Sequence, residues 1–207
     1  MSAREGHRNH DRGRALAEHS IELNMNKKNE LTSLSKFLSL VLRHEPQAIG
    51  LVLDDAGWVS TDELLRCLAA ANRPTTFELL RQVVETSDKQ RFALSEGGSR
   101  IRANQGHSIP VELGLAPRTP PDQLYHGTAT RFLDSILQHG LTRRARHHVH
   151  LTVNATTAGA VGQRYGQLVM LSIDAKHMHA DGHLFYCSDN GVWLTEAVPP
   201  AYLTVMQ

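Results

Sequence analysis

The amino-acid sequence predicts an α+β fold with two lobes, and three observations lead to this prediction. Residues 31–103 contain three short helical patterns followed by two short strand candidates. From Leu124 onward the candidates are mostly short strands with few helices between them. A segment rich in proline separates the two parts and contains Pro110, Pro117, Pro120 and Pro121. We therefore expect a flexible tail over residues 1–28, a first lobe over 29–109, a linker over 110–122 and a second lobe over 123–207.

The composition is that of a soluble globular protein without a strong global charge. The 207 residues are 41% hydrophobic and 21% charged, and the formal net charge is +1. This balance gives no overall sign of nucleic-acid binding, so any anion site has to be a local cluster. No apolar run approaches the length of a membrane span, and Cys67 and Cys187 are too few for a disulfide framework or a CxxC metal site. We expect a cytoplasmic monomer without a membrane partner.

The chain begins with a polar, basic segment and continues into an amphipathic helix. Residues 1–28 show little apolar periodicity, which predicts a tail that is at most partly helical from Ala15 onward. Apolar residues then recur at helical spacing over 31–42, and Pro46 stops the helix. Arg43 and His44 stand in its last turn, where cations complement the helix dipole and need no further function to explain them.

Two more helices and a hairpin complete the first lobe. Residues 51–53 and 58–59 bracket a turn and suggest a short extended pair. A capping box at 60–63 opens a second helix, and residues 74–78 open a third in the same way. The side chains expected to face inward are Leu64, Leu65 and Leu68 in the second helix and Phe77, Leu80, Val83 and Val84 in the third.

The hairpin is predicted from strand candidates at 91–94 and 99–103, joined by Glu96-Gly97-Gly98. Three short helices followed by a hairpin form the winged-helix pattern, which often contacts nucleic acid, although a fold does not fix a function. The chain then leaves the wing through a loop around Gly106. Its donors are Arg102, Gln105, His107 and Ser108, and this loop is equally consistent with an anion site and with an ordinary polar loop.

In the second lobe the strand candidates are 124–128, 149–151, 168–173, 184–186, 192–194 and 202–205. Helices are expected through 132–137, ended by Gly140, and over 155–161. A dense cationic loop covers 143–148. The sequence has no GxGxxG and no P-loop, which argues against a Rossmann or P-loop cofactor site.

The residues bear on three kinds of site: a metal centre, a serine hydrolase and a phosphate site. The chain has 13 histidines, but no HExxH or CxxC spacing completes a metal shell, so we expect no metal even with Asp181 near His179 and His183. A serine hydrolase is disfavoured because there is no GxSxG motif. The cationic residues suggest a phosphate site instead. If the lobes fold face to face, Arg43, His44, Arg91 and Arg146 could converge on one phosphate, although spacing alone does not establish this.

A set of motifs, which occur in the family's order, resembles those of the NAD-dependent RNA 2′-phosphotransferases. This is the KptA-type family of tRNA splicing and RNA processing. The motifs cover nearly everything from Leu31 to the C-terminus: 35–39, 42–46, 57–59, 88–92, 101–108, 125–128, 146–151 and 190–195. The resemblance implies a winged-helix, RNA-binding lobe packed on an ADP-ribosyltransferase-like, NAD-binding lobe. The active site would lie between them.

The resemblance also assigns residues. The family's catalytic Arg-His-Arg-Arg set falls on Arg43, His44, Arg91 and Arg146. The residues that would hold NAD are His126, Gly127, Thr128, His150 and, in place of a catalytic glutamate, Val192. Contacts to the substrate phosphate or RNA are expected from Lys36, Arg102, Gln105, His107 and Ser108. An apolar residue in place of the glutamate suits a nucleophile that is already anionic, because a carboxylate would repel it.

The implied reaction consumes NAD in two steps. An internal RNA 2′-phosphate attacks the anomeric carbon of the nicotinamide ribose and expels nicotinamide, and the 2″-hydroxyl of that ribose then attacks the new phosphodiester. The products are RNA with a 2′-hydroxyl and ADP-ribose 1″,2″-cyclic phosphate. In this scheme the three arginines clamp the phosphate, and His44 is the candidate for proton transfer. The alternatives are an ADP-ribosyltransferase acting on nucleic-acid phosphates or another target, and a non-catalytic winged-helix nucleic-acid binder.

Overall fold

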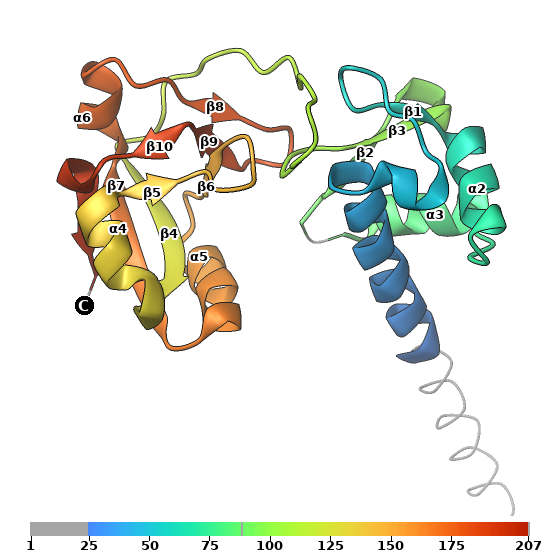
Figure 1. Ribbon diagram of the computed structural model, residues 1–207, viewed down its shortest axis with the longest axis horizontal. Coiled ribbons are helices and arrows are strands. Elements are labelled where there is room, and N and C mark those ends of the chain that lie inside the picture. Colours follow the sequence, from blue (N-terminus) through green and yellow to red (C-terminus); the bar gives the residue numbers. More distant parts are fainter. Residues whose placement is uncertain (1–24, 88, 207) are drawn as a thin grey trace, which may run out of the picture.

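A computed structural model describes residues 25–87 and 89–206 of the chain (Figure 1). Most of the predicted tail, residues 1–24, and Asp88 of the family motif lie outside the described residues. The described elements form two groups, each around its own hydrophobic core. We call residues 25–108 the N-terminal lobe and residues 123–206 the C-terminal lobe, and the chain between them crosses from one to the other (Figure 1). Helices and antiparallel sheets occur together, which confirms the predicted α+β class.

The N-terminal lobe contains helices and one three-stranded antiparallel sheet of order β1-β3-β2. Its first helix covers residues 25–43 and so includes residues 25–28 of the predicted tail, for which the sequence allows partial helix. The elements that follow are η1 (Pro46–Ile49), β1 (Val59–Ser60), α2 (Thr61–Ala70), α3 (Phe77–Glu85), β2 (Phe92–Leu94), η2 (Glu96–Gly98) and β3 (Arg100–Ala103). The predicted hairpin is present, with Phe92 opposite Ala103 and Leu94 opposite Ile101.

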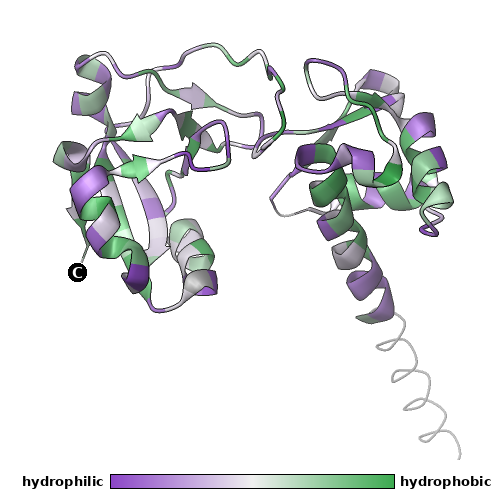
Figure 2. Cartoon of the chain, viewed as in Figure 1, coloured by the Kyte–Doolittle hydropathy of each residue, from purple (hydrophilic) through white to green (hydrophobic). Residues whose placement is uncertain are grey.

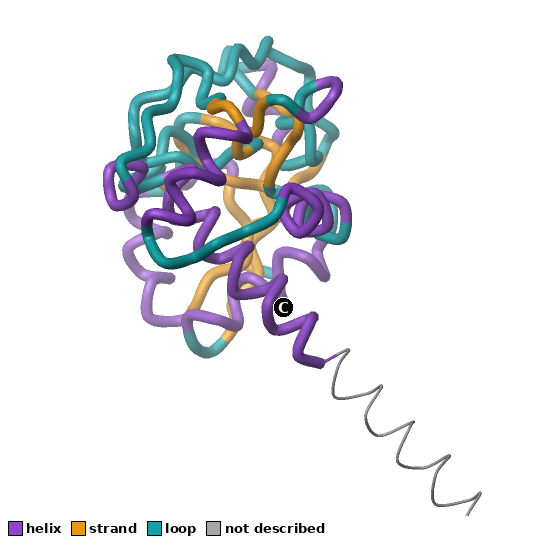
Figure 3. The backbone as a smooth tube through the Cα atoms, turned by 90° about the vertical axis from the view of Figure 1, so that its right-hand side faces the viewer, coloured by secondary structure: helices purple, strands orange, loops and turns teal. Residues whose placement is uncertain are grey.

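The core of this lobe comes from the apolar face of each helix. Leu38, Leu42, Leu64, Leu80 and Ile101 are completely buried. The first helix buries Leu34, Leu38, Val41 and Leu42, as its periodicity predicts, and Figure 2 shows its hydrophilic residues concentrated toward the lower end. In Figure 3 the N-terminal end of the same helix projects away from the rest of the molecule. The last turns of this helix, which carry Leu38 and Leu42, are therefore held in the core while its polar side stays accessible.

Three details of this lobe differ from the sequence prediction. Residues 51–53 form no strand, because Val59–Ser60 pairs with β3 instead, while the Asp54 carboxylate accepts from the Ala56 and Trp58 amides to form the turn. Ser60 is the N-cap of α2 but its side chain makes no capping hydrogen bond, whereas the hydroxyl of Thr76 accepts from the Leu79 amide at 3.2 Å. Phe77 does not face inward and is 39% exposed.

The C-terminal lobe is built on a three-stranded antiparallel sheet of order β11-β7-β4. Its strands are β4 (Gln123–Ala129), β7 (Leu168–Asp174) and β11 (Leu203–Val205). A second sheet pairs β6 (Val149–Leu151), β9 (Trp193–Thr195) and β8 (Tyr186–Cys187), and a third pairs β5 (Leu141–Thr142) with β10 (Ala197–Val198). The helical elements are η3 (Thr130–Phe132), α4 (Leu133–His139), α5 (Ala155–Gly162), η4 (Gln163–Tyr165), α6 (Ala175–Ala180) and η5 (Pro200–Tyr202). A bridge between Tyr125 and Thr152 connects the first two sheets.

Most predicted elements of this lobe are present, with shifted ends. The strand expected at 184–186 begins only at Tyr186, because Phe185 turns into the core and Leu184 is exposed. The strand expected at 192–194 begins at Trp193. β5, β10 and α6 were not predicted. They are short, and their polar or small residues give little periodic signal.

The backbones of β4 and α5 lie very close together. A Cβ atom on Gly127 would lie 1.9 Å from the Ala158 carbonyl oxygen, and one on Gly162 would lie 2.9 Å from the Thr128 amide nitrogen. Two glycines therefore let strand and helix touch backbone to backbone. Among the described residues there is no helix long and apolar enough to cross a membrane.

Candidate active site between the lobes

Arg43 and His44 lie where the first helix ends. The His44 and Glu45 amides both donate to the Leu40 carbonyl, and Pro46 then starts η1, so the chain turns away and leaves both side chains half-buried beside the second lobe. The Arg43 guanidinium donates from Nη2 to the Arg91 carbonyl at 3.2 Å and lies over the Phe92 ring. The first helix and the segment before β2 are thus joined through Arg43.

The loop after β3 is attached to the same helix end. The Ser108 amide donates to the Arg43 carbonyl, and the Ser108 hydroxyl lies 2.9 Å from His44 Nδ1. Gly106 has a φ of +89°, and a Cβ there would lie 3.5 Å from Arg43 Nη1 and 3.8 Å from His150 Nε2. The backbone at Gly106 therefore separates a cation of the N-terminal lobe from a histidine of the C-terminal lobe by a single residue's width.

The electrostatics show that the predicted cations are close together. Burial, followed by the charges of Arg91 and Arg146, lowers the pKa of Arg43 to about 10. Burial, followed by Arg43 and Arg146, also lowers the pKa of His44. Within residues 25–87 and 89–206, Arg43 makes no ion pair with a carboxylate, and its buried Nε has no hydrogen-bond partner. A buried guanidinium that is surrounded by like charges and has no carboxylate partner among the described residues, as at Arg43, favours the binding of an anion.

Three more histidines near this cluster are held neutral. Burial, then Arg146 and Arg43, lowers the pKa of His150 to about 3, and burial, then Arg43, lowers that of His107 to about 4. Burial also lowers the pKa of His126, whose Nδ1 lies 3.0 Å from the His150 carbonyl oxygen. Because a carbonyl only accepts, Nδ1 carries the proton, and the neutral ring keeps Nε2 as an acceptor. His126 can therefore accept a hydrogen bond from a hydroxyl group.

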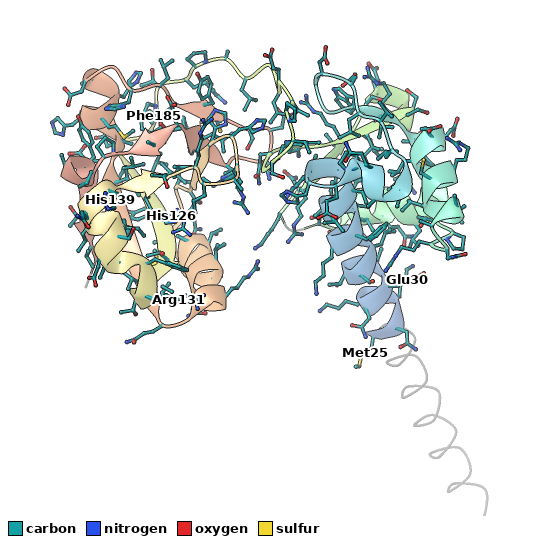
Figure 4. The ribbon with its side chains drawn as sticks, viewed as in Figure 1. Met25, Glu30, His126, Arg131, His139 and Phe185 are labelled. Atoms are coloured by element: carbon teal, nitrogen blue, oxygen red, sulfur yellow. The ribbon has the colours of Figure 1, made fainter. Side chains whose placement is uncertain are left out.

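A cavity of about 380 Å³ opens in the C-terminal lobe beside the cations. Its walls include His126, Gly127 and Thr128 from β4, Arg143, Arg144 and Arg146 from the cationic loop, and His148 and His150 at β6. Figure 4 labels His126 on β4, and its ring faces β6, where Nδ1 lies against the His150 carbonyl oxygen. A wall that contains both arginines and an imidazole acceptor suits a ligand that carries phosphates and hydroxyl groups.

A second cavity, of about 390 Å³, lies between the lobes. It is lined by Gln105, Gly106 and His107 of the N-terminal lobe and by His148, His150, Tyr186 and Leu194 of the C-terminal lobe, among others. Val192 lines neither cavity. Its carbonyl closes a turn by accepting from the Ser188 amide and hydroxyl, and it is Leu194, two residues further on, that pairs with His150.

The remaining predicted substrate residues are more widely distributed. Arg102 lies over the Trp58 ring of its own lobe and donates to the Asp189 carboxylate of the C-terminal lobe at 3.1 Å. The neighbouring Asn190 donates to the Lys89 carbonyl at 2.9 Å, so this turn fastens the two lobes together. Lys36 is exposed on the first helix, in a hollow that also reaches Arg43 and Arg91. Arg102 is therefore a lobe contact, whereas Lys36 remains available to a ligand.

Sequence reasoning did not single out several residues that line the cavities. Arg143, Arg144, His148 and Tyr186 come from loops or strand ends, and the one available signal was the density of cations at 143–148. In the described part of the chain, no three His, Cys, Asp or Glu side chains gather as metal ligands would. The polar side chains that line the two cavities are largely guanidinium and imidazole groups.

Comparison with known proteins identifies a family that covers most of the chain. Residues 28–197 match the family described as "RNA 2′-phosphotransferase, Tpt1 / KptA family". A "Probable RNA 2′-phosphotransferase" of Agrobacterium fabrum is 58% identical over 84% of this chain and 94% of the relative. Relatives with the same description in Pseudomonas aeruginosa and Nostoc punctiforme are 55% and 51% identical over 84% of this chain and 96% and 97% of their own lengths. The match includes every candidate residue named above.

Proposed function

Because this chain belongs to the RNA 2′-phosphotransferase, Tpt1 / KptA family, we propose that it removes an internal 2′-phosphate from RNA, with NAD as the acceptor. It is accordingly an enzyme, a transferase. The observation that carries the proposal is the position of Arg43. It lies within charge–charge range of Arg91 and Arg146 and has no carboxylate partner among the described residues, next to a cavity lined by His126 and His150.

The proposed reaction has two steps. In the first step the 2′-phosphate would attack the anomeric carbon of the nicotinamide ribose of NAD, and nicotinamide would leave. In the second step the 2″-hydroxyl of that ribose would attack the phosphate and displace the 2′-oxygen of the RNA. The RNA keeps a 2′-hydroxyl, and the phosphate leaves as ADP-ribose 1″,2″-cyclic phosphate.

Arg43, Arg91 and Arg146 would hold the phosphate through both steps. A guanidinium stays protonated at any working pH, even where burial and neighbouring charges lower the pKa of Arg43 to about 10. Because the three guanidinium groups are already positioned, the site needs little reorganisation when negative charge shifts on the phosphate during the reaction. The lowered pKa of His44 keeps its ring largely neutral near pH 7, so the ring can accept a proton and return it.

The residues present fit NAD in the C-terminal cavity. His126 and Thr128 offer hydrogen-bonding groups for ribose hydroxyls, and Arg143, Arg144 and Arg146 would offset the pyrophosphate charge. His150, neutral and with Nε2 unpartnered among the described residues, lies between this cavity and the interlobe cavity. We assign the apolar position opposite His150 to Leu194 in preference to Val192, because Leu194 pairs with His150 and lines the interlobe cavity.

The fold assignment is part of the same proposal. The three helices and hairpin of residues 25–103 support a winged-helix lobe that contacts RNA. The C-terminal lobe, with its cavity along β4, supports an ADP-ribosyltransferase-like lobe. We propose that the protein acts as a cytoplasmic monomer on 2′-phosphorylated RNA such as a spliced tRNA.

The test is incubation of the protein with NAD and an oligoribonucleotide that carries one internal 2′-phosphate. The expected result is the release of nicotinamide together with loss of the 2′-phosphate from the RNA. Release of nicotinamide while the phosphate stays on the RNA would contradict the proposal and indicate an ADP-ribosyltransferase. RNA binding without any nicotinamide release would indicate a binding protein.

Single substitutions test the residue roles. Arg91→Ala and Arg146→Ala should slow the second step and let ADP-ribosylated RNA accumulate, since less positive charge then faces the migrating phosphate. Arg131→Ala, which removes an exposed cation that lines neither cavity, is the control. Normal turnover by both Arg91→Ala and Arg146→Ala would refute the assignment of these arginines.

A further inference from the structure

A basic groove leads away from the candidate active site along the first helix. It encloses about 810 Å³ and runs between the first helix, the end of α3, the segment before β2 and η4 of the C-terminal lobe. The cations along it are Lys27, Lys28, Lys36 and Arg43 from the helix, Lys89 and Arg91 from the segment before β2, and Arg164 from η4. Among the described residues that line it there is no carboxylate and no aromatic ring.

The helix presents these groups as one stripe. Lys28, Thr32, Lys36, Ser39 and Arg43 follow each other at intervals of three and four residues, which places them on one helix face. From Lys28 to Arg43 the helix rises by about 22 Å at about 1.5 Å per residue. The stripe is therefore far longer than one phosphate group and ends at the phosphate site itself.

The hydroxyl groups of the groove are mostly occupied, which leaves recognition to the charges. Thr32, Ser39 and Thr86 each donate to a carbonyl one helical turn earlier. The buried Ser87 hydroxyl is different, because it has no partner in the part of the chain that the structure describes. A surface of lysines and arginines without rings for base stacking contacts the sugar-phosphate backbone and is indifferent to base identity.

We propose that this groove binds consecutive backbone phosphates on one flank of the 2′-phosphorylated nucleotide, and that Lys28, Lys36 and Arg164 are its contacts. The inference rests on the proposed function, because Arg43 and Arg91 belong both to the groove and to the phosphate site. Arg164 lines the groove from the C-terminal lobe, so the bound RNA strand passes between the two lobes. The enzyme therefore prefers RNA that extends beyond the reacting nucleotide on that flank, whatever its sequence.

The first experiment changes the RNA and leaves the protein intact. Fluorescently labelled 2′-phosphorylated RNA is compared with two versions in which the phosphates of one flank or the other are replaced by neutral methylphosphonates, and binding is measured by anisotropy. Neutralising one flank should weaken binding about fivefold per contacted phosphate at 0.1 M salt, and neutralising the other flank should have little effect. Equal affinity of all three RNAs would overturn the proposal.

The second experiment changes the groove. A variant with Lys28→Gln, Lys36→Gln and Arg164→Gln is compared with a variant of equal charge loss, Arg66→Gln, Arg131→Gln and Lys176→Gln, whose side chains lie outside the groove. The slope of log Kd against log salt should become shallower by about 2 in the groove variant, from about 0.7 per lost phosphate contact, and stay near the wild-type value in the control. Identical slopes in the two variants would overturn the proposal.

Turnover separates this inference from the proposed function. In the wild type, kcat/KM for 2′-phosphate removal should increase when phosphates are added on the preferred flank, and the groove variant should lose most of that gain. If the wild type removes the phosphate equally well from short and long RNA, the groove proposal fails while the function stands. If none of the RNAs causes nicotinamide to be released from NAD, the proposed function is wrong. The methylphosphonate and salt measurements still decide whether the groove binds RNA.

Discussion

Gly127 allows the sharpest test of how the candidate site is built. It belongs to the His-Gly-Thr segment of β4 that resemblance assigned to NAD binding, yet its missing side chain would point at α5. A Cβ on Gly127 would lie 1.9 Å from the Ala158 carbonyl oxygen and 2.6 Å from the Ala158 carbonyl carbon. Both are backbone atoms, so no side-chain rotation can relieve the contact. We therefore predict that Gly127→Ala destabilises the fold.

The size of the effect follows from the geometry. To bring the 1.9 Å contact to an ordinary 3.4 Å, strand and helix would have to separate by about 1.5 Å. Overpacking of a core usually costs about 1–3 kcal/mol, and two rigid backbones place this case at the upper end, at about 3 kcal/mol or more. For a chain of this length, about 1 kcal/mol lowers Tm by about 2–4 °C, so Tm should fall by about 6–12 °C.

The assay is thermal unfolding followed by circular dichroism, with a matched control in the same helix. A Cβ on Gly159 would meet the Leu168 and Met170 side chains at 3.6 and 3.7 Å, which are ordinary contacts. Because alanine is the better helix former, Gly159→Ala should leave the stability unchanged or raise it by about 0.5–1 kcal/mol. Gly162→Ala, which meets the Gly127 and Thr128 backbone from the opposite side, should destabilise as Gly127→Ala does.

One result would refute this reasoning. If Gly127→Ala unfolds at the wild-type temperature but binds NAD more weakly, the glycine serves ligand approach and not the packing of α5 on β4. A loss of stability shared by Gly127→Ala and Gly162→Ala, but not by Gly159→Ala, would support the packing account.

Three further predictions test the caps, the buried histidines and the orientation of His44. Thr76→Ala should cost about 1 kcal/mol of unfolding free energy in urea because it removes a capping bond, while Ser60→Ala, which removes none, should cost clearly less. The folded-state pKa of His107, lowered to about 4, lies below the unfolded value, so its contribution is present above about pH 6.5 and is lost as the pH falls. Between pH 7.5 and 5 it should remove about 2 kcal/mol, and His107→Gln should flatten the urea-derived pH profile; an unchanged profile would contradict this. Ser108→Ala should lower kcat about fivefold and shift its pH profile through the lost contact with His44, with recovery in Ser108→Thr; a change in KM alone would argue against a role in positioning His44.

The sequence was sufficient for the elements whose signals are local. The first helix and the 92–103 hairpin follow from periodicity and turn residues, and the structure contains both. It was not sufficient to distinguish two similar N-caps. Ser60 and Thr76 both precede acidic first turns, but the backbone of Ser60 pairs with Arg100 in the sheet and its hydroxyl does not cap α2. Pairing with a strand some forty residues away decides this, and no local pattern reports it.

The candidate site could likewise be predicted only in part, because it depends on contacts between residues far apart in the sequence. Arg43 and His150 are far apart in the sequence, but a Cβ on Gly106 would lie within 4 Å of both side chains. The pattern of residues identified which side chains carry charge, and family resemblance indicated that they act together. The 143–148 loop carries no periodic signal, so the contribution of Arg143 and Arg144 to the cavity wall becomes visible only in three dimensions.

The helix end explains why the cations can gather before any phosphate arrives. The negative end of the helix dipole lies at Arg43 and His44, and it stabilises positive charge there by about 0.3–1 kcal/mol. The Arg91 carbonyl accepts from the Arg43 guanidinium, and the Phe92 ring faces it. These contacts offset part of the repulsion from Arg91 and Arg146, but the lowered pKa of Arg43 shows that repulsion and burial still outweigh them. The helix terminus and the phosphate site are therefore one arrangement. The helix end reduces the cost of gathering the cations, and an anion bound between the lobes would offset the repulsion that remains.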